Sequence, residues 1–236
     1  MECYNPSNPL ELPDADEEEH LARTYFDVEV DFMVHPGYRT DDRFIGIRHT
    51  ALSAIVKYTC DQNDAFVPYL AINYVDRFLS TNINIPVILN GQGVKRNVEL
   101  FAFSCVSIAS KIRSSDFSVS DLLKHQLAEF KDDVEIMELH IMEGLNQRVR
   151  PVTAITFMYL LLPGLLIKEV QQQPFPTTFA ARIIFQIHKD IRFTEFRPST
   201  LAASAILAST YERLPGSHSQ FLKKISSSSV VIQSEV

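Results

Sequence analysis

The sequence of 236 residues contains no tryptophan, only 7 glycines and only 3 cysteines. So few glycines argue against glycine-rich phosphate loops and against an all-β fold with many tight turns. Cys3, Cys60 and Cys105 are far apart and odd in number, so they form neither a C-x-x-C metal pair nor a complete set of disulfides. No basic and then apolar leader opens the sequence, and we expect a reduced protein inside the cell.

Long apolar runs and an excess of positive charge are also missing. The longest apolar stretches, near residues 98–112 and 152–167, are shorter than the ~20 residues that span a bilayer. Of the 29 acidic residues, 7 lie in residues 1–19, which contain no Lys or Arg and so carry the whole net charge of −7. The rest of the chain is electrically balanced and lacks the positive field that non-specific nucleic-acid binding uses. We interpret residues 1–16 as an acidic, irregular leader.

Hydrophobic spacing predicts helices along most of the chain and almost no strands. We therefore expect an all-α protein in two helical blocks. We predict Thr40 as the N-cap of its helix, and Pro151 at the first position of the helix that opens the second block. The expected helices cover about 15–35, 41–60, 64–80, 98–112, 118–127 and 131–148 in the first block, and 152–162, 177–190 and 198–213 in the second, with one further turn at 217–225.

Known catalytic and cofactor motifs do not occur. The sequence has no phosphate-binding loop, dinucleotide fingerprint, zinc-protease helix or nucleophile elbow, and its histidines never stand four residues apart on one helix. The adjacent acids Asp132 and Asp133 diverge on a helix and are interpreted as a solvated helix start. We predict no catalytic residue, no metal site and no cofactor, although a site assembled from distant residues stays open.

Two charged residues stand in otherwise apolar helical stripes. Arg48 lies in the stripe of the helix at 41–60, and Asp76 lies in the apolar run 71–79 of the next helix. A buried charge is costly unless it is paired and hydrogen-bonded. We therefore predict that Arg48 and Asp76 form an ion pair between the two helices, with a structural role.

Lys111 and Glu138 have simple interpretations from periodicity alone. Lys111 ends the apolar helix at 98–112, where a cation complements the helix dipole. Glu138 stands between Met137 and Leu139 in the next long helix, at an exposed position.

Three segments nevertheless resemble the cyclin family: LAINYVDRFLS at 70–80, SIASKI at 107–112, and IMELHIMEGLNQRVRPVTAITFM at 136–158. Their order and spacing also resemble a cyclin, and the resemblance covers roughly residues 17–215. Within the family, the first and third segments look most like plant D-type cyclins, especially a short class.

The resemblance implies an N-terminal helix followed by two tandem cyclin-fold bundles, of which the short second one could be incomplete. The implied domains are residues 17–150 and 151–225, followed by a Ser-rich tail at 226–236. It also implies a partner, the catalytic subunit of a cyclin-dependent kinase, whose backbone around the regulatory αC helix is contacted by Lys111 and Glu138. Arg48 and Asp76 match the buried structural pair of the family.

The sequence departs from the family pattern in several places, among them a longer loop at 81–97 and the three sites that follow. Cys3 stands in MECYN rather than in the L-x-C-x-E motif that docks retinoblastoma-like proteins. Arg113, Ser114 and Ser115 follow Lys111, where most cyclins have acidic residues, which could weaken or retune kinase pairing. Ser53-Ala54 replaces an Asp-Trp pair of which the Trp helps to form a substrate-docking groove.

The leading hypothesis is a nuclear regulatory subunit that activates a cyclin-dependent kinase and promotes the G1/S transition, with retinoblastoma-related protein as a substrate of the complex. The alternative is a divergent cyclin-fold module that binds a kinase weakly or acts as a scaffold or competitor. A nucleic-acid-binding relative of the fold ranks third, and a metabolic enzyme last. We expect no nucleic-acid or membrane partner.

Overall fold

The computed structural model describes residues 23–60, 65–81, 84–89, 91, 93–114, 131–165 and 175–227. Within these ranges every regular element is a helix, which confirms the all-α prediction. The helix expected at 118–127 lies outside the described residues. None of the described helices has both the length and the apolar character that a membrane crossing needs.

The described residues form two compact units. Residues 34–150 and 188–195 form one, the central unit, and residues 23–33, 151–187 and 196–227 form the other, the terminal unit. The chain passes between units at 150 and 151, close to the predicted block boundary, whereas the N-terminal helical segment groups with the terminal unit rather than with the first box. The domain assignment itself stays a prediction.

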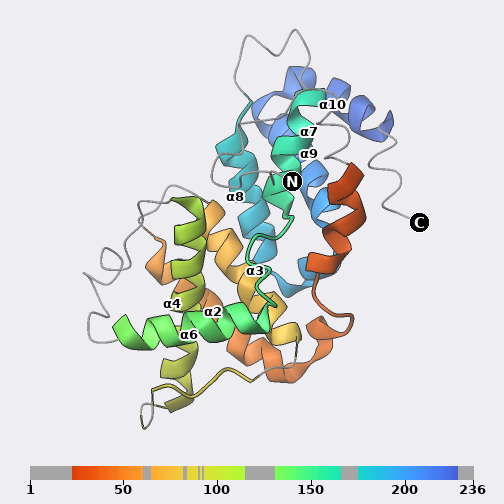
Figure 1. Ribbon diagram of the computed structural model, residues 1–236. Coiled ribbons are helices and arrows are strands. Elements are labelled where there is room, and N and C mark those ends of the chain that lie inside the picture. Colours follow the sequence, from red (N-terminus) through yellow and green to blue (C-terminus); the bar gives the residue numbers. More distant parts are fainter. Residues whose placement is uncertain are drawn as a thin grey trace. The chain divides into compact units, whose positions relative to one another are not determined.

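The central unit is built around one helix, α4 (Gly93–Arg113), which packs against three others. These are α2 (Asp42–Tyr58), α3 (Phe66–Ser80) and α6 (Lys131–Gly144), and all are labelled in Figure 1. Short 3-10 helices lie at Tyr38–Thr40 and Ile191–Glu195. All of α3 except Asn73 is buried, which explains why most of its residues are apolar and why its charged residue Asp76 needs a partner.

Small side chains allow the close packing of these helices. The buried face of α4 carries Ala102, Cys105 and Ala109 beside large residues such as Phe101 and Phe103. Without bulky side chains at these points, neighbouring helices can approach closely.

Gly144, at the end of α6, is another position where close packing requires a small residue. A Cβ atom at this position would overlap the ring of Phe78 on α3.

Helix boundaries differ from the predictions where a cap or a distant contact sets them. Asp41, and not Thr40, caps α2, because its carboxylate accepts a hydrogen bond from the Arg43 N–H at 3.0 Å. Pro151 is not the first residue of α7 (Ala154–Leu165), because Thr153 caps that helix through the Thr156 N–H at 3.2 Å.

The start of α4 lies about one turn before the predicted one at residue 98. The amide of Asn97 fixes the segment that precedes α4, accepting from the N–H groups of Ile88 and Leu89 and donating to the Pro86 carbonyl. The Asn97 side chain thus supplies the hydrogen-bond partners that these backbone groups would otherwise find in the main chain. The spacing of apolar residues cannot predict such a contact.

The terminal unit contains α7, α8 (Thr177–His188, whose last residue groups with the central unit), α9 (Pro198–Arg213) and α10 (Pro215–Ser227). Helix α9 packs against α7 and α10 (Figure 1). The range of α9 is the predicted one. The predicted single turn at 217–225 is wrong, because α10 is a full helix that buries Phe221 and Ile225.

Candidate functional site

Lys111 and Glu138 lie together on the central unit. Lys111 is in the last turn of α4 and Glu138 is in the middle of α6, and these two helices pack against each other. The Lys111 Nζ atom lies 2.8 Å from Glu138 Oε1 and 2.6 Å from Oε2. The Glu138 side chain is 9% exposed and the Lys111 side chain is 41% exposed. The pair therefore has an enclosed carboxylate and an ammonium group that reaches solvent.

Apolar side chains are also exposed on α6, the helix that carries Glu138. Leu139, the neighbour of Glu138, is 58% exposed, and Ile136 is exposed as well. Behind the pair, the buried Cys105 thiol has a raised pKa, caused first by burial and then by the negative charge of Glu138. The helix that carries Glu138 thus has a carboxylate close to the apolar core of the unit and exposed apolar residues that a partner could cover.

Arg48 and Asp76 form a second ion pair, and this one is almost completely enclosed. The Arg48 Nε atom lies 2.8 Å from Asp76 Oδ1 and its Nη2 atom lies 3.1 Å from Oδ2, with the side chains 6% and 1% exposed. The guanidinium group also donates to the carbonyls of His188 and Lys189 at 2.7 and 2.8 Å. The structure therefore brings together the two charges that sequence analysis paired, and it joins them to a distant segment.

Tyr38 and His188 complete the surroundings of Asp76, and sequence analysis identified neither. The Tyr38 hydroxyl donates to Asp76 Oδ1 at 2.8 Å, and His188 Nε2 lies 3.3 Å from Oδ2. Burial by itself raises the pKa of Asp76, but His188 and Arg48 outweigh it and hold the pKa below its ordinary value. Burial and the charge of Asp76 raise the pKa of Tyr38. Only the fold could reveal these partners, because His188 is 140 residues from Arg48.

Glu29 is a buried carboxylate in the terminal unit that sequence analysis also missed. Its oxygens accept from the N–H and the hydroxyl of Ser199, both at 2.9 Å, in the first turn of α9. Arg197 approaches to 3.6 Å. Burial outweighs these interactions and raises the pKa of Glu29. The carboxylate therefore supplies the helix cap that the sequence before α9 lacks.

The residues that depart from the cyclin pattern lie in different surroundings. The Arg113 guanidinium lies over the ring of Phe66, 5.4 Å from its centroid, while Ser114 is exposed. Ser115 and Cys3 lie outside the described residues. Ser53 and Ala54 line a pocket between α2 and α4.

A metal-binding cluster of His, Cys, Asp and Glu side chains does not occur among the described residues. The residues singled out in the central unit form instead one enclosed ion pair, Arg48 with Asp76, and one whose cation reaches solvent, Lys111 with Glu138. This arrangement can hold a fold together and can present hydrogen-bonding groups, and no group of these residues has the geometry of a metal centre.

Comparisons with known proteins identify the family of this chain. The family model of the cyclin N-terminal domain matches residues 25–150. The chain is 31% identical to cyclin-D6-1 of Arabidopsis thaliana, covering 92% of this chain and 72% of that protein. It is also 31% identical to Arabidopsis cyclin-D4-2 (81% and 65% covered) and 33% identical to rice cyclin-D1-2 (61% and 39% covered).

The fold is similar to that of a viral cyclin from herpesvirus saimiri. The two structures align with a TM-score of 0.56 and 17% identity, over 92% of this chain and 98% of the viral one. The family match covers more than half of the chain, and the similarity to plant D-type cyclins covers most of it. Cyclins are non-catalytic regulatory subunits of protein kinases, and family membership implies a cyclin-dependent kinase as the class of partner. The chain belongs to the cyclin family, with plant D-type cyclins among its relatives.

Proposed function

We propose that this chain binds the catalytic subunit of a cyclin-dependent kinase and activates it, with Lys111 and Glu138 as the polar centre of the interface. The observation that carries the proposal is the partly exposed Lys111 side chain, paired with Glu138 on a helix that also exposes apolar side chains. A fully structural pair would be expected to bury its cation as well.

The chemistry of the pair suits a main-chain partner. An ammonium group has three N–H donors and no acceptor, whereas a carboxylate has several lone pairs and no donor. In the free chain two hydrogen bonds join the groups, which leaves capacity on both for a third molecule. Together they can bind carbonyl oxygens and N–H groups of one backbone segment, while Leu139 and Ile136 supply apolar contact area.

Activation would follow from the position of that backbone segment. A chain that holds the regulatory αC helix of a kinase inward favours the Lys–Glu ion pair of the kinase and an open activation loop. In keeping with the D-type relatives, we place this activity in the nucleus at the G1/S transition, with retinoblastoma-related protein as a substrate of the complex. The chain supplies a binding surface and performs no chemical step.

The experiment is a pull-down with a cyclin-dependent kinase subunit, followed by phosphorylation of histone and of retinoblastoma-related protein. We expect the double variant Lys111→Glu with Glu138→Lys to reduce kinase binding and activation by about tenfold or more, because it reverses the polarity of each contact. The matched control exchanges Arg39 and Glu195, an exposed pair 2.8 Å apart in the same unit, and should retain both activities. Full activity in the first variant would contradict the site.

Arg113 favours a second candidate function, a cyclin-fold module that binds a kinase without activating it and acts as a scaffold or competitor. A cation lies two residues after Lys111, where an acidic residue is usual in the family, and it lies over Phe66. Binding without substrate phosphorylation would support this candidate. Recovery of phosphorylation in Arg113→Asp would then identify the charge as the cause.

A further inference from the structure

Ser114 is an exposed serine that directly follows α4 and continues its helical hydrogen bonding. Its N–H donates to the Ser110 carbonyl at 2.9 Å, which is the spacing of an α-helical hydrogen bond. Residues three apart on a helix lie on the same face, so Ser114 and Lys111 are neighbours on the surface of α4. The serine hydroxyl therefore lies on the face that carries the ammonium group paired with Glu138.

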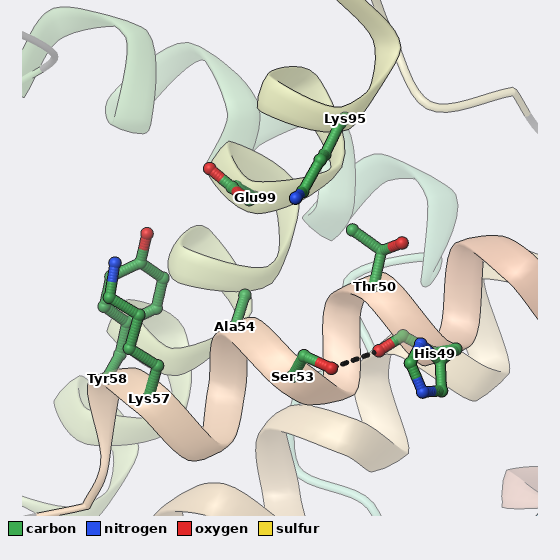
Figure 2. A pocket seen from close by; sticks show the side chains of 8 residues that line it. All are labelled: His49, Thr50, Ser53, Ala54, Lys57, Tyr58, Lys95 and Glu99. Atoms are coloured by element: carbon green, nitrogen blue, oxygen red, sulfur yellow. Dashed lines mark hydrogen bonds between the residues drawn. The ribbon is translucent and has the colours of Figure 1, made fainter.

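The hydroxyl group of Ser114 is more accessible than those of other exposed serines. It makes no hydrogen bond within the part of the chain that the structure describes. Figure 2 shows the contrast in α2, where the hydroxyl of the exposed Ser53 donates to the His49 carbonyl at 2.9 Å. Ser227 likewise donates to the Lys224 carbonyl at 3.1 Å. A hydroxyl that is not bonded to its own helix is the better acceptor for a transferred group.

Two cations precede Ser114 in the last turn of α4. Lys111 stands three residues before it, and Arg113 stands directly before it. The Lys111 side chain is 41% exposed, and the Arg113 guanidinium lies over the ring of Phe66. Basic residues close before a serine match protein kinases whose substrate groove is acidic, because the charges are complementary. The surroundings of Ser114 therefore suit a basophilic serine/threonine kinase that uses MgATP.

A phosphate on Ser114 would occupy the capacity of Lys111 that a kinase backbone would otherwise use. The ammonium group has three donors, and the two carboxylate oxygens of Glu138 lie 2.8 and 2.6 Å from it. A phosphoserine adds a charge of about −1.5 to −2 and three strong acceptor oxygens. The helix dipole disfavours an anion at the end of α4, so the phosphate gains most by binding the nearby ammonium. No donor of Lys111 then remains for a carbonyl of another molecule.

We propose that a basophilic serine/threonine kinase phosphorylates Ser114, and that the phosphate prevents Lys111 from binding the cyclin-dependent kinase. In the modification, the Ser114 Oγ atom attacks the γ-phosphorus of ATP, the bond to the β,γ-bridging oxygen breaks, and ADP leaves. The hydroxyl proton passes to the catalytic carboxylate of the modifying enzyme. The regulatory part rests on the proposed function of Lys111 and Glu138, whereas the modification itself does not.

The first experiment tests the modification. The full chain is incubated with MgATP and protein kinase C as a basophilic probe, and the modified residue is identified by mass spectrometry. We expect phosphate on Ser114 at an initial rate that falls by about tenfold or more in Lys111→Gln with Arg113→Gln. The control Lys57→Gln with Lys95→Gln removes two exposed cations of the same unit and should keep the rate. No phosphate on Ser114, or equal rates in the two double variants, would overturn the proposal.

The second experiment tests the regulation, with phosphoserine inserted in place of Ser114 during translation. In the pull-down with a cyclin-dependent kinase subunit, we expect binding to fall by about tenfold or more, whereas Ser114→Ala binds normally. The matched control carries phosphoserine in place of Ser226, which stands three residues after the exposed Lys223 near the end of α10. This control should bind normally. Unchanged or stronger binding with phosphoserine at 114, or an equal loss in the control, would overturn the proposal.

Phosphorus NMR separates a failure of this proposal from a failure of the proposed function, because it needs no kinase. The second ionisation of the phosphate, near about pH 6, should have a midpoint about 0.2–0.4 pH unit lower with Lys111 than in Lys111→Gln. An unchanged midpoint would overturn this proposal even where the unmodified chain binds the kinase. An unmodified chain that fails to bind the kinase would overturn the proposed function and, with it, the regulatory role of Ser114.

Discussion

Asp76 and Glu138 are both nearly buried carboxylates of the central unit, yet the cations paired with them differ in exposure to solvent. Asp76 is paired with an enclosed Arg48, which also donates to two carbonyls, and it accepts a further hydrogen bond from Tyr38. Glu138 is paired with a Lys111 that keeps close to half of its side chain in solvent. The first pair makes most of its possible hydrogen bonds within the chain, and the second has more capacity left for another molecule.

This difference teaches how one kind of interaction serves two purposes. An enclosed ion pair contributes to stability only if its geometry and hydrogen bonds repay the cost of removing both charges from water. A pair at the surface pays little of that cost and adds little stability, so it remains available for recognition. The comparison predicts that Asp76 variants affect folding and that Lys111 or Glu138 variants affect binding.

The strongest test of the comparison is Asp76→Ala. The variant leaves the Arg48 charge buried without its carboxylate, and we expect a loss of ~3–5 kcal/mol in the free energy of unfolding, measured by urea denaturation. Glu195→Ala, which removes an exposed carboxylate paired with Arg39, is the control and should cost at most ~1 kcal/mol. A stability of Asp76→Ala equal to that of the control would show that the enclosed pair is not structural.

Glu29 is a third buried carboxylate, and its cation is farther away than those of Asp76 and Glu138. The Arg197 guanidinium lies 3.6 Å from the Glu29 carboxylate. The pKa of Glu29 is raised above the ordinary value of 4.5, so the folded chain holds its proton to higher pH than the unfolded chain does. Stability should therefore fall as pH rises from 4.5 through the raised pKa. The variant Glu29→Gln should lose that part of the pH dependence in thermal unfolding curves.

The contribution of Asp76 to stability changes with pH in the opposite direction, so Asp76 serves as the internal reference for this measurement. Its pKa is lowered below the ordinary value of 3.8, so its contribution to stability is present above pH 3.8 and is lost as pH falls through the lowered pKa. This loss of stability at low pH should persist in the variant Glu29→Gln. If the decline above pH 4.5 also persisted, Glu29 would not be its source.

The smallest expected effect concerns the stability of the surface pair. The exchange of Lys111 and Glu138, which is predicted to reduce kinase binding by about tenfold or more, should cost less than the ~3 kcal/mol expected for Asp76→Ala, because Lys111 keeps part of its side chain in solvent. A much larger loss in urea denaturation would place the Lys111 pair in the same class as Arg48 and Asp76, and the distinction between the two pairs would fail.

Much of the fold was predictable because helical periodicity is a local property. The range of α9 and the buried character of α4 follow from the spacing of apolar residues. The starts of α4 and α7 and the full length of α10 were missed, because Asn97, Thr153 and the burial of Phe221 set them. Such contacts carry no periodic signal.

The candidate site was predictable to different extents. Arg48 and Asp76 could be paired from the sequence, because each is a charge in an apolar stripe and burial demands a partner. Lys111 and Glu138 have no such signal, since each fits an ordinary surface position, and only the resemblance to cyclins singled them out. Two residues of the pocket between α2 and α4, Ser53 and Ala54, were singled out by the same resemblance, whereas its other lining residues depend on the contact between the two helices.

By itself, the sequence determined that the chain is helical, that its charge is concentrated at the N-terminus, and that Arg48 and Asp76 need partners. The tertiary structure decided which distant groups meet these charges. In the folded chain the His188 carbonyl accepts a hydrogen bond from Arg48, and the Tyr38 hydroxyl donates one to Asp76. The Glu29 carboxylate accepts from the Ser199 N–H at the start of α9. The physical reason is that helix propensity acts between residues three and four apart, whereas the pairing of buried polar groups acts across any separation that folding brings into contact.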